Sequence, residues 1–203
     1  MDVVSIKLDC MSGEPITDLI GRRLRELRAA AGLSLDALAA KSGVSRSNIS
    51  LIERGQSSPT AVVLDKLSSA LGVSVASLFE AGARPAAPSP LARVAEQPVW
   101  QDPASGYRRR NVSPPGVSPI QLVDVIFPAG QKLQFETAAR DADIHQQLWM
   151  IDGAMEIAHG ESRWRLEAGD CLAFRLDAPV QFHNPGDQAA RYLVALTGAS
   201  TWR

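Results

Sequence analysis

Short hydrogen-bonding side chains and one guanidinium are gathered in the segment SRSNIS, residues 45–50. An Arg side chain can donate two hydrogen bonds to guanine in the major groove of DNA, and an Asn side chain can pair with adenine. Serine hydroxyls both donate and accept hydrogen bonds. The side chains concerned are Ser45, Arg46, Ser47, Asn48 and Ser50. Together they suit a surface that reads base edges, provided that one helix presents them on one side.

Two short helices joined by a tight turn are predicted to position these side chains. Ser34 is a favourable N-cap for a helix over residues 35–41, in which apolar residues recur with helical spacing. Gly43 can adopt the positive φ that a tight turn between crossed helices requires. Ser45 is then the expected cap of a second helix, which runs to about Arg54.

The second helix is expected to bury Ile49 and Ile52, so that its polar residues project around its N-terminus. A recognition helix enters the major groove with this end first, and the helix dipole favours phosphate there. Arg54, Gln56 and Ser57 follow the helix and are expected to contact phosphates, which sets register without reading sequence. Two alternatives stay open: Ser and Asn only cap a helix of an ordinary bundle, and Arg54 is a solvated helix end.

Three further helices are predicted around this pair. An apolar stripe indicates a helix over residues 18–31, Thr60 caps another, and Ser74 begins a short last helix that ends at Phe79. Five helices in so short a stretch predict a compact all-α domain over residues 16–81.

Residues 19–79 resemble the helix-turn-helix domain of the phage-repressor-like, or xenobiotic-response-element (XRE), regulators. The signature is GLSLDALAAKSGVSRSNISLIERGQSSPT. The resemblance implies that the helix capped by Ser45 is the recognition helix. It also implies that Arg28 and Glu53 pair to fix the angle between helices, and it places Leu35 where family members often carry Gln.

The charge of the chain predicts that one copy of this domain does not suffice for specific DNA binding. The formal net charge of the whole chain is -1, and residues 16–80 contain eight Arg or Lys against six Asp or Glu. So small a surplus provides few phosphate contacts. We therefore expect a homodimer on double-stranded DNA, with a palindromic operator whose half-sites are about 34 Å apart.

The chain is long enough for two small domains. Residues 1–15 contain no long apolar run, so they are predicted to be a flexible leader without signal peptide or membrane segment, and the protein is predicted to be cytoplasmic. Two cysteines, Cys10 and Cys171, form neither a disulfide framework nor a zinc spacing.

The composition changes at a Pro-rich segment, which we interpret as a linker over residues 82–95. After it, short apolar or alternating runs are separated by turn signals, and residues 96–203 are predicted to form an antiparallel β-sandwich or β-barrel. The runs are residues 120–127, 148–151, 155–158, 162–166, 171–176 and 192–196.

Residues from about 117 to 197, which contain these turns, resemble the cupin family. The resemblance is carried by PAGQ, WMIDGAMEI, LEAGDCLAF and FHNPGDQAARYLV. Where cupins usually carry metal ligands, this chain has Gln146, Val180 and a segment, residues 138–142, without His. His145 and His183 lie at odd offsets from ligand positions and are expected to point away from the pocket. The resemblance implies an antiparallel β-barrel, and we predict a cupin with no metal and no other cofactor.

If the strands follow the register of cupins, the resemblance also implies a pocket inside the barrel. It would be apolar, with one amide that can both donate and accept, and its side chains would be Gln146, Leu148, Met150, Val180 and Phe182. The alternative is that these residues only fill the core. No nucleophile–base motif stands out in the sequence, so an enzyme is not expected.

The resulting prediction is a multidomain α and β protein that acts as a sequence-specific DNA-binding transcriptional regulator. It combines a five-helix helix-turn-helix domain with a cupin that dimerises and senses a small-molecule effector. Two alternatives stay open: a metal-dependent cupin enzyme with a DNA-binding appendage, and an antitoxin or scaffold that uses its helices for protein contacts.

Overall fold

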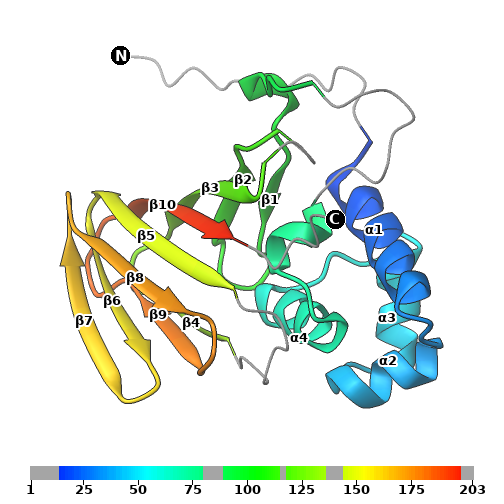
Figure 1. The fold of residues 1–203 in the computed structure, drawn as a ribbon. Helices are drawn as coiled ribbons and strands as arrows, with labels where there is room; N and C mark the ends of the chain where they lie inside the picture. Colours follow the sequence, from blue (N-terminus) through cyan, green and yellow to red (C-terminus); the bar gives the residue numbers. More distant parts are fainter. Residues whose placement is uncertain (1–13, 80–88, 115–117, 136–143, 198–203) are drawn as a thin grey trace.

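The computed structural model describes residues 14–79, 89–114, 118–135 and 144–197. A helical part and a β part lie side by side (Figure 1). Within those ranges no helix is both long and apolar enough to cross a membrane. The helical part consists of α1 (Ile16–Ala30), α2 (Leu35–Ser42), α3 (Arg46–Glu53), α4 (Ala61–Leu71) and the 3-10 helix η1 (Val75–Phe79).

The helices begin where the sequence places their caps. The Ser34 side chain accepts a hydrogen bond from the Ala37 N–H, and the Ser45 side chain accepts one from Asn48. Gly43, between α2 and α3, has a φ of 68°, which confirms the predicted left-handed turn. Local chemistry therefore defines the helix-turn-helix unit.

The prediction of five α-helices is wrong in one respect, because the fifth helix is the 3-10 helix η1. The Ser77 N–H donates to the carbonyl oxygen of Ser74 at 3.1 Å and to its Oγ at 3.2 Å. This spacing of three residues is the 3-10 pattern, which is common in short pieces of this kind. The described residues thus hold four α-helices in the helical part.

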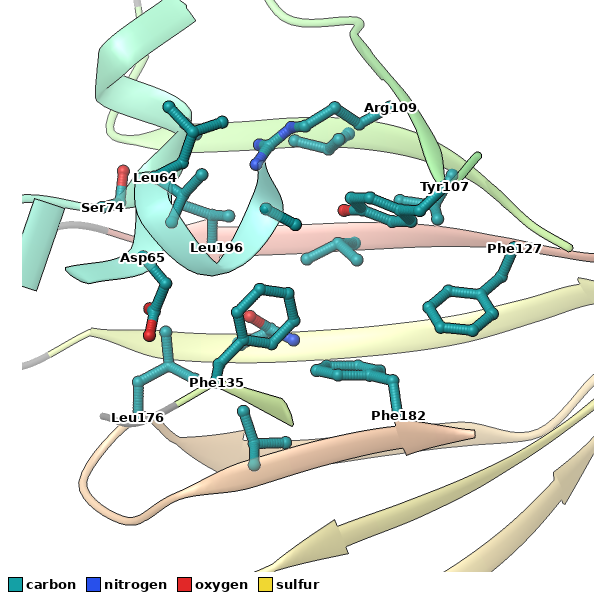
Figure 2. Close-up of a pocket in the computed structure, with 18 of the residues that line it drawn as sticks. Leu64, Asp65, Ser74, Tyr107, Arg109, Phe127, Phe135, Leu176, Phe182 and Leu196 are labelled. Atoms are coloured by element: carbon teal, nitrogen blue, oxygen red, sulfur yellow. The ribbon is translucent and has the colours of Figure 1, made fainter. Parts of the chain in front are cut away.

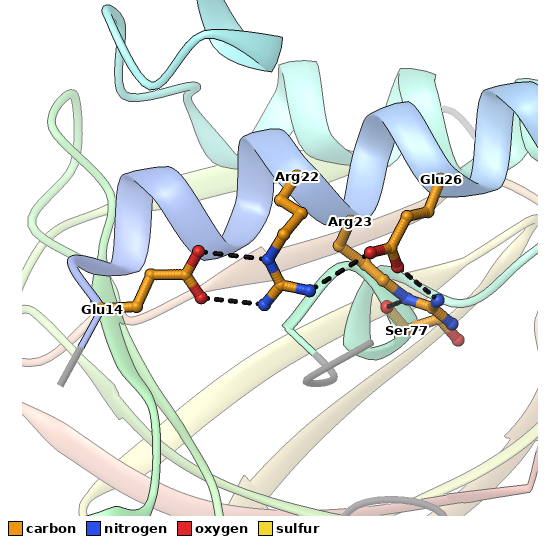
Figure 3. A network of polar contacts seen from close by, with 5 residues as sticks. All are labelled: Glu14, Arg22, Arg23, Glu26 and Ser77. Carbon is orange, nitrogen blue, oxygen red and sulfur yellow. Dashed lines mark hydrogen bonds and ion pairs between the residues drawn. The ribbon is translucent and has the colours of Figure 1, made fainter. Parts of the chain in front are cut away.

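Close packing holds α1 against its neighbours. A Cβ at Gly21 would collide with the backbone oxygen of Ile52, so glycine allows α1 to approach α3. On another face, the Arg23 Nε donates to the Ser77 carbonyl at 3.1 Å and ties α1 to η1 (Figure 3). The adjacent Arg22 pairs with Glu14 and Glu26 along the same exposed edge.

The β part consists of two antiparallel sheets. The first has the order β1 (Val99–Gln101), β2 (Arg108–Asn111), β3 (Ile120–Phe127), β10 (Ala190–Thr197), β5 (His145–Asp152) and β8 (Cys171–Arg175). The second has the order β4 (Lys132–Phe135), β9 (Val180–His183), β6 (Ala154–His159) and β7 (Ser162–Glu167). A single 3-10 turn, η2 (Val94–Glu96), precedes β1.

All six predicted strands are present, whereas β1, β2, β4 and β9 were not predicted. The predicted barrel is found as two facing sheets: across the interior, the rings of Phe182 on β9 and Tyr192 on β10 stack with centroids 6.4 Å apart. Hydrogen-bonded closure of the two sheets into one ring is not found among the strands that the structure describes.

The helical and β parts share one core. The Phe79 ring lies 5.8 Å from that of Trp100, and Tyr107 continues the aromatic contacts from Trp100 to Phe127. Beside them the buried Ala61 N–H donates to Asp102 Oδ1 at 3.3 Å, which places the first residue of α4 on the β part. Buried side chains form one contiguous cluster across both parts. The helical part is therefore seated on the β part.

Candidate nucleic-acid interface and interior cavity

The N-terminus of α3 presents the predicted reading residues together. Ser45, Arg46 and Ser47 are exposed, and Asn48 and Ser50 are half-buried. The Ser45 Oγ lies 3.3 Å from the Ser47 Oγ and accepts the Asn48 N–H at the same distance. Ile49 and Ile52 are fully buried on the opposite face. One face of α3 thus carries the donors and acceptors, and the other holds the helix in place.

Arg46 forms an ion pair across the turn with Asp36 on α2, with the Nε and Oδ1 atoms 3.0 Å apart. The side chains are 64% and 76% exposed. Such surface pairs contribute between about 0 and 1 kcal/mol. The pair is therefore weak enough for the guanidinium to exchange Asp36 for a base edge, while the nearby carboxylate opposes an approaching phosphate.

The predicted phosphate contacts lie just after α3. Arg54 and Gln56 are exposed and Ser57 is half-buried. Gly55, with a φ of 68°, ends the helix, and the Gln56 N–H returns to the Leu51 carbonyl at 2.9 Å in a Schellman arrangement. The Arg54 Nε donates to the Ser50 carbonyl at 3.2 Å, which leaves its terminal nitrogens for other partners.

Arg28 and Glu53 form the pair that the family resemblance implied. The Arg28 Nε and Nη2 donate to the two Glu53 carboxylate oxygens at 2.6 and 2.9 Å, and Glu53 is buried. These hydrogen bonds raise the pKa of Arg28. The Arg25 Nη2 also donates to the Glu53 carbonyl at 2.8 Å. Two arginines of α1 thereby fix the C-terminal end of α3.

A cavity of about 90 Å³ lies between the β part and the helical part. Gln146, Val180 and Phe182 line it, whereas Leu148 and Met150, both fully buried, lie in the core outside its lining. Sequence reasoning missed two features of this cavity: Arg109 on β2 lines it, and so do residues of α4 and η1. A signal for Arg109 existed, because three consecutive arginines in one strand cannot all face solvent.

The histidines are engaged away from the cavity. His145 is exposed, the His183 Nδ1 lies 2.9 Å from Glu156 Oε2, and the His159 Nε2 lies 3.3 Å from Asp177 Oδ1. In the part of the chain that the structure describes, no three His, Cys, Asp or Glu residues form a group that could hold a metal ion. Residues 138–142 and Cys10 lie outside the described residues.

This geometry defines a class: a helix-turn-helix unit packed on a β domain of two antiparallel sheets. The helix-turn-helix family model matches residues 24–78. The transcriptional regulator SinR of Bacillus subtilis is 43% identical over 63 residues, which is 30% of this chain and 57% of SinR. The uncharacterized regulator y4dJ of Sinorhizobium fredii is 41% identical over 56 residues, 28% of this chain and 73% of that protein.

The chain therefore belongs to the XRE-type helix-turn-helix family of transcriptional regulators. It spans a little over half the length of SinR. The crystal structure of a helix-turn-helix regulator from Vibrio cholerae is 21% identical, with a TM-score of 0.68 over 90% of this chain and 96% of that one. This likeness extends the shared fold to both parts of the molecule.

Proposed function

We propose that this protein regulates transcription by binding a specific operator with the N-terminus of α3. The observation that supports this most is the polar face of α3, from the exposed Ser45 to the half-buried Ser50, on a helix whose other face is fully buried. In this proposal Arg46 and Asn48 read base edges, and the serines contact bases or nearby phosphates. Arg54, Gln56 and Ser57 hold the phosphate backbone and set the register.

The active form in this proposal is a homodimer on a palindromic operator. The helical region has only a small surplus of cations over anions, and Asp36 already pairs with Arg46, so one copy makes few phosphate contacts. Two copies double those contacts and match the symmetry of an inverted repeat. In this proposal, residues 16–81 form the DNA-binding domain and residues 96–203 form the domain that dimerises and senses the effector. Residues 82–95 link the two domains.

The β part is proposed to sense a small molecule rather than to catalyse a metal-dependent reaction. Gln146 and Val180 stand where cupins usually carry ligands, and both line the cavity instead. The metal content of the purified protein tests this assignment. Stoichiometric iron, manganese, nickel or zinc in the β part would contradict it and favour a cupin enzyme with a DNA-binding appendage.

Selection of duplexes from a randomised pool by the full chain tests the proposed function. We expect an enriched inverted repeat with half-site centres about one helical turn, roughly 34 Å, apart or a multiple of that spacing. Light scattering of the protein on this duplex is expected to give two copies per site. Recovery of no shared sequence, or of a single unrepeated site bound by one copy, would contradict the proposal.

A further inference from the structure

The cavity lies between the helical part and the β part, and both form its walls (Figure 2). Leu64 and Asp65 of α4, and Ser74 just before η1, line one side. The inward residues of the sheets line the rest, among them Phe135 and Phe182, whose rings meet edge to face at 5.7 Å. A molecule bound here would touch both parts at once.

Arg109 brings a buried positive charge to this cavity. Its side chain is only 6% exposed, and its guanidinium lies 4.6 Å above the Phe79 ring. The buried Nε has no hydrogen-bond partner, and no carboxylate pairs with this guanidinium among the described residues. Burial lowers the pKa of Arg109, which expresses the cost of holding its charge away from water. Figure 2 shows the guanidinium directed toward Leu64 and the interior.

Two buried phenols and one amide share the lining of the cavity with Arg109. Burial raises the pKa of Tyr107 and raises that of Tyr192 well above its ordinary value, so both phenols keep their protons. Gln146 adds an amide to the same lining. Asp65 is a buried carboxylate of the same lining, but it lies toward Leu176 in Figure 2, away from Tyr107. The Arg109 end of the cavity therefore favours a negatively charged group, and the remaining walls are mostly apolar.

We propose that this cavity binds a small monocarboxylate with a short apolar chain, held by its carboxylate on the Arg109 guanidinium. This deepens the sensing role proposed above and rests on it. A carboxylate accepts the two parallel hydrogen bonds of a guanidinium and neutralises the buried charge. A volume of about 90 Å³ corresponds to roughly three water molecules, so the chain of the ligand is short.

Ligand binding at this place bears on DNA binding because the helical part forms one wall. Phe79 ends η1 and stacks on Arg109, and α4 follows α3 directly in the chain. A ligand that contacts both α4 and Arg109 stabilises one position of the helical part relative to the β part over other positions. By linkage, it then changes operator affinity in the same proportion as the operator changes ligand affinity.

Thermal unfolding of the full chain tests the proposal, with sodium butyrate as the probe and butyramide and sodium chloride as controls. Butyrate at about 100 times its Kd is expected to raise the Tm by roughly 5 °C or more, whereas the neutral amide and the chloride salt do not. Arg109→Met is expected to abolish the shift. The matched variant Arg108→Met, at the exposed neighbouring position on β2, is expected to retain it.

A ligand-holding role and a purely structural role of Arg109 predict different results for the Arg109→Met variant. If it holds a ligand, Arg109→Met keeps or raises the Tm without butyrate, because a buried unpaired charge is removed. A shift of equal size with butyramide, or one that persists in Arg109→Met, would overturn the proposal. Should Arg109→Met fail to fold, butyrate against butyramide on the unaltered protein decides. Butyrate binding without operator specificity would refute only the proposed function, and operator binding without butyrate binding only this inference.

Discussion

The buried carboxylate of Glu53 fixes α3 against α1 and so orients the surface that we propose reads DNA. Glu53 is 5% exposed at its side chain, and its two oxygens accept hydrogen bonds from Arg28, whose side chain is 17% exposed. Removing one member of such a pair leaves a buried charge without compensation. Stability and DNA affinity should therefore depend together on this contact.

Glu53→Ala is expected to lower the free energy of unfolding by about 3–5 kcal/mol, because it strands the Arg28 guanidinium. Urea unfolding measures this loss. Glu26→Ala is the matched control, since Glu26 pairs with Arg22 and Arg23 at the surface, where each pair contributes about 1 kcal/mol or less. Equal losses in the two variants would show that the buried pair has no special role.

Asp36→Ala is expected to strengthen operator binding at low salt while leaving stability within about 1 kcal/mol. The substitution frees Arg46 from its exposed partner and removes a negative charge that opposes phosphate. Titrations at increasing salt measure the effect, which should shrink as screening increases. An unchanged affinity at low salt would mean that Asp36 is not near the bound DNA.

At the scale of elements, the approach of α1 to α3 determines where the reading helix lies. Gly21 of α1 faces the backbone oxygen of Ile52, whereas Gly43 between α2 and α3 has open space around its Cβ position but a φ of 68°. The two glycines are therefore required for different reasons. Gly21 leaves room for the close contact between α1 and α3, and Gly43 adopts the positive φ of the turn.

Gly21→Ala and Gly43→Ala are expected to destabilise the protein for different physical reasons. Gly21→Ala forces α1 and α3 apart, costs about 1–3 kcal/mol and weakens operator binding. Gly43→Ala costs about 1 kcal/mol through backbone strain and leaves the α1–α3 contact intact. Denaturant unfolding and operator titration of both variants separate the effects. Full affinity in a stably folded Gly21→Ala variant would contradict this account of helix spacing.

Three neighbouring strands are tied by a second buried carboxylate. Asp124 on β3 accepts from Arg110 on β2 at 2.6 Å and from Arg191 on β10 at 2.9 Å. Burial alone would raise the pKa of Asp124, but the hydrogen bonds from Arg191 and Arg110 together outweigh it, and the net shift is downward. A lowered pKa means that folding favours the charged carboxylate.

The pH dependence of Asp124→Asn follows from the sign of this shift. The stabilisation by Asp124 is fully present above its ordinary pKa of about 3.9 and is lost as the pH falls toward the lowered value. The variant is therefore expected to be less stable than the parent at neutral pH, with the difference narrowing below about pH 4. Unfolding curves across this range measure it; a difference that is constant with pH would refute the assignment.

At the scale of the whole molecule, the reading helix and the cavity are connected through one core. Phe79 of η1 contacts both Trp100 of β1 and Arg109 of β2, while α4 contributes to the cavity wall. A change in the cavity can therefore alter how the helical part is seated. In the proposed function, this connection is the physical basis for coupling ligand binding in the cavity to DNA binding by α3.

The sequence predicted what local chemistry decides. Serine caps, the left-handed Gly43 and apolar spacing are each set within a few residues, so the helices of the reading unit were placed correctly. Four strands were missed, among them β1 and β9, which have only three and four residues and so show little alternation. The position of Arg109 over the Phe79 ring depends on contacts between residues far apart in the chain, which no local pattern contains.

The affinity of Arg46→Ala for the selected operator, measured with the full chain, tests the central claim most directly. Arg163→Ala is the matched control, because Arg163 is exposed on β7 in the β part. We expect Arg46→Ala to lose about 1–3 kcal/mol of binding free energy and to relax the preference at one base pair of each half-site, with Arg163→Ala unchanged. An Arg46→Ala variant that binds with undiminished affinity and selectivity would contradict the account and favour a helical domain made for protein contacts.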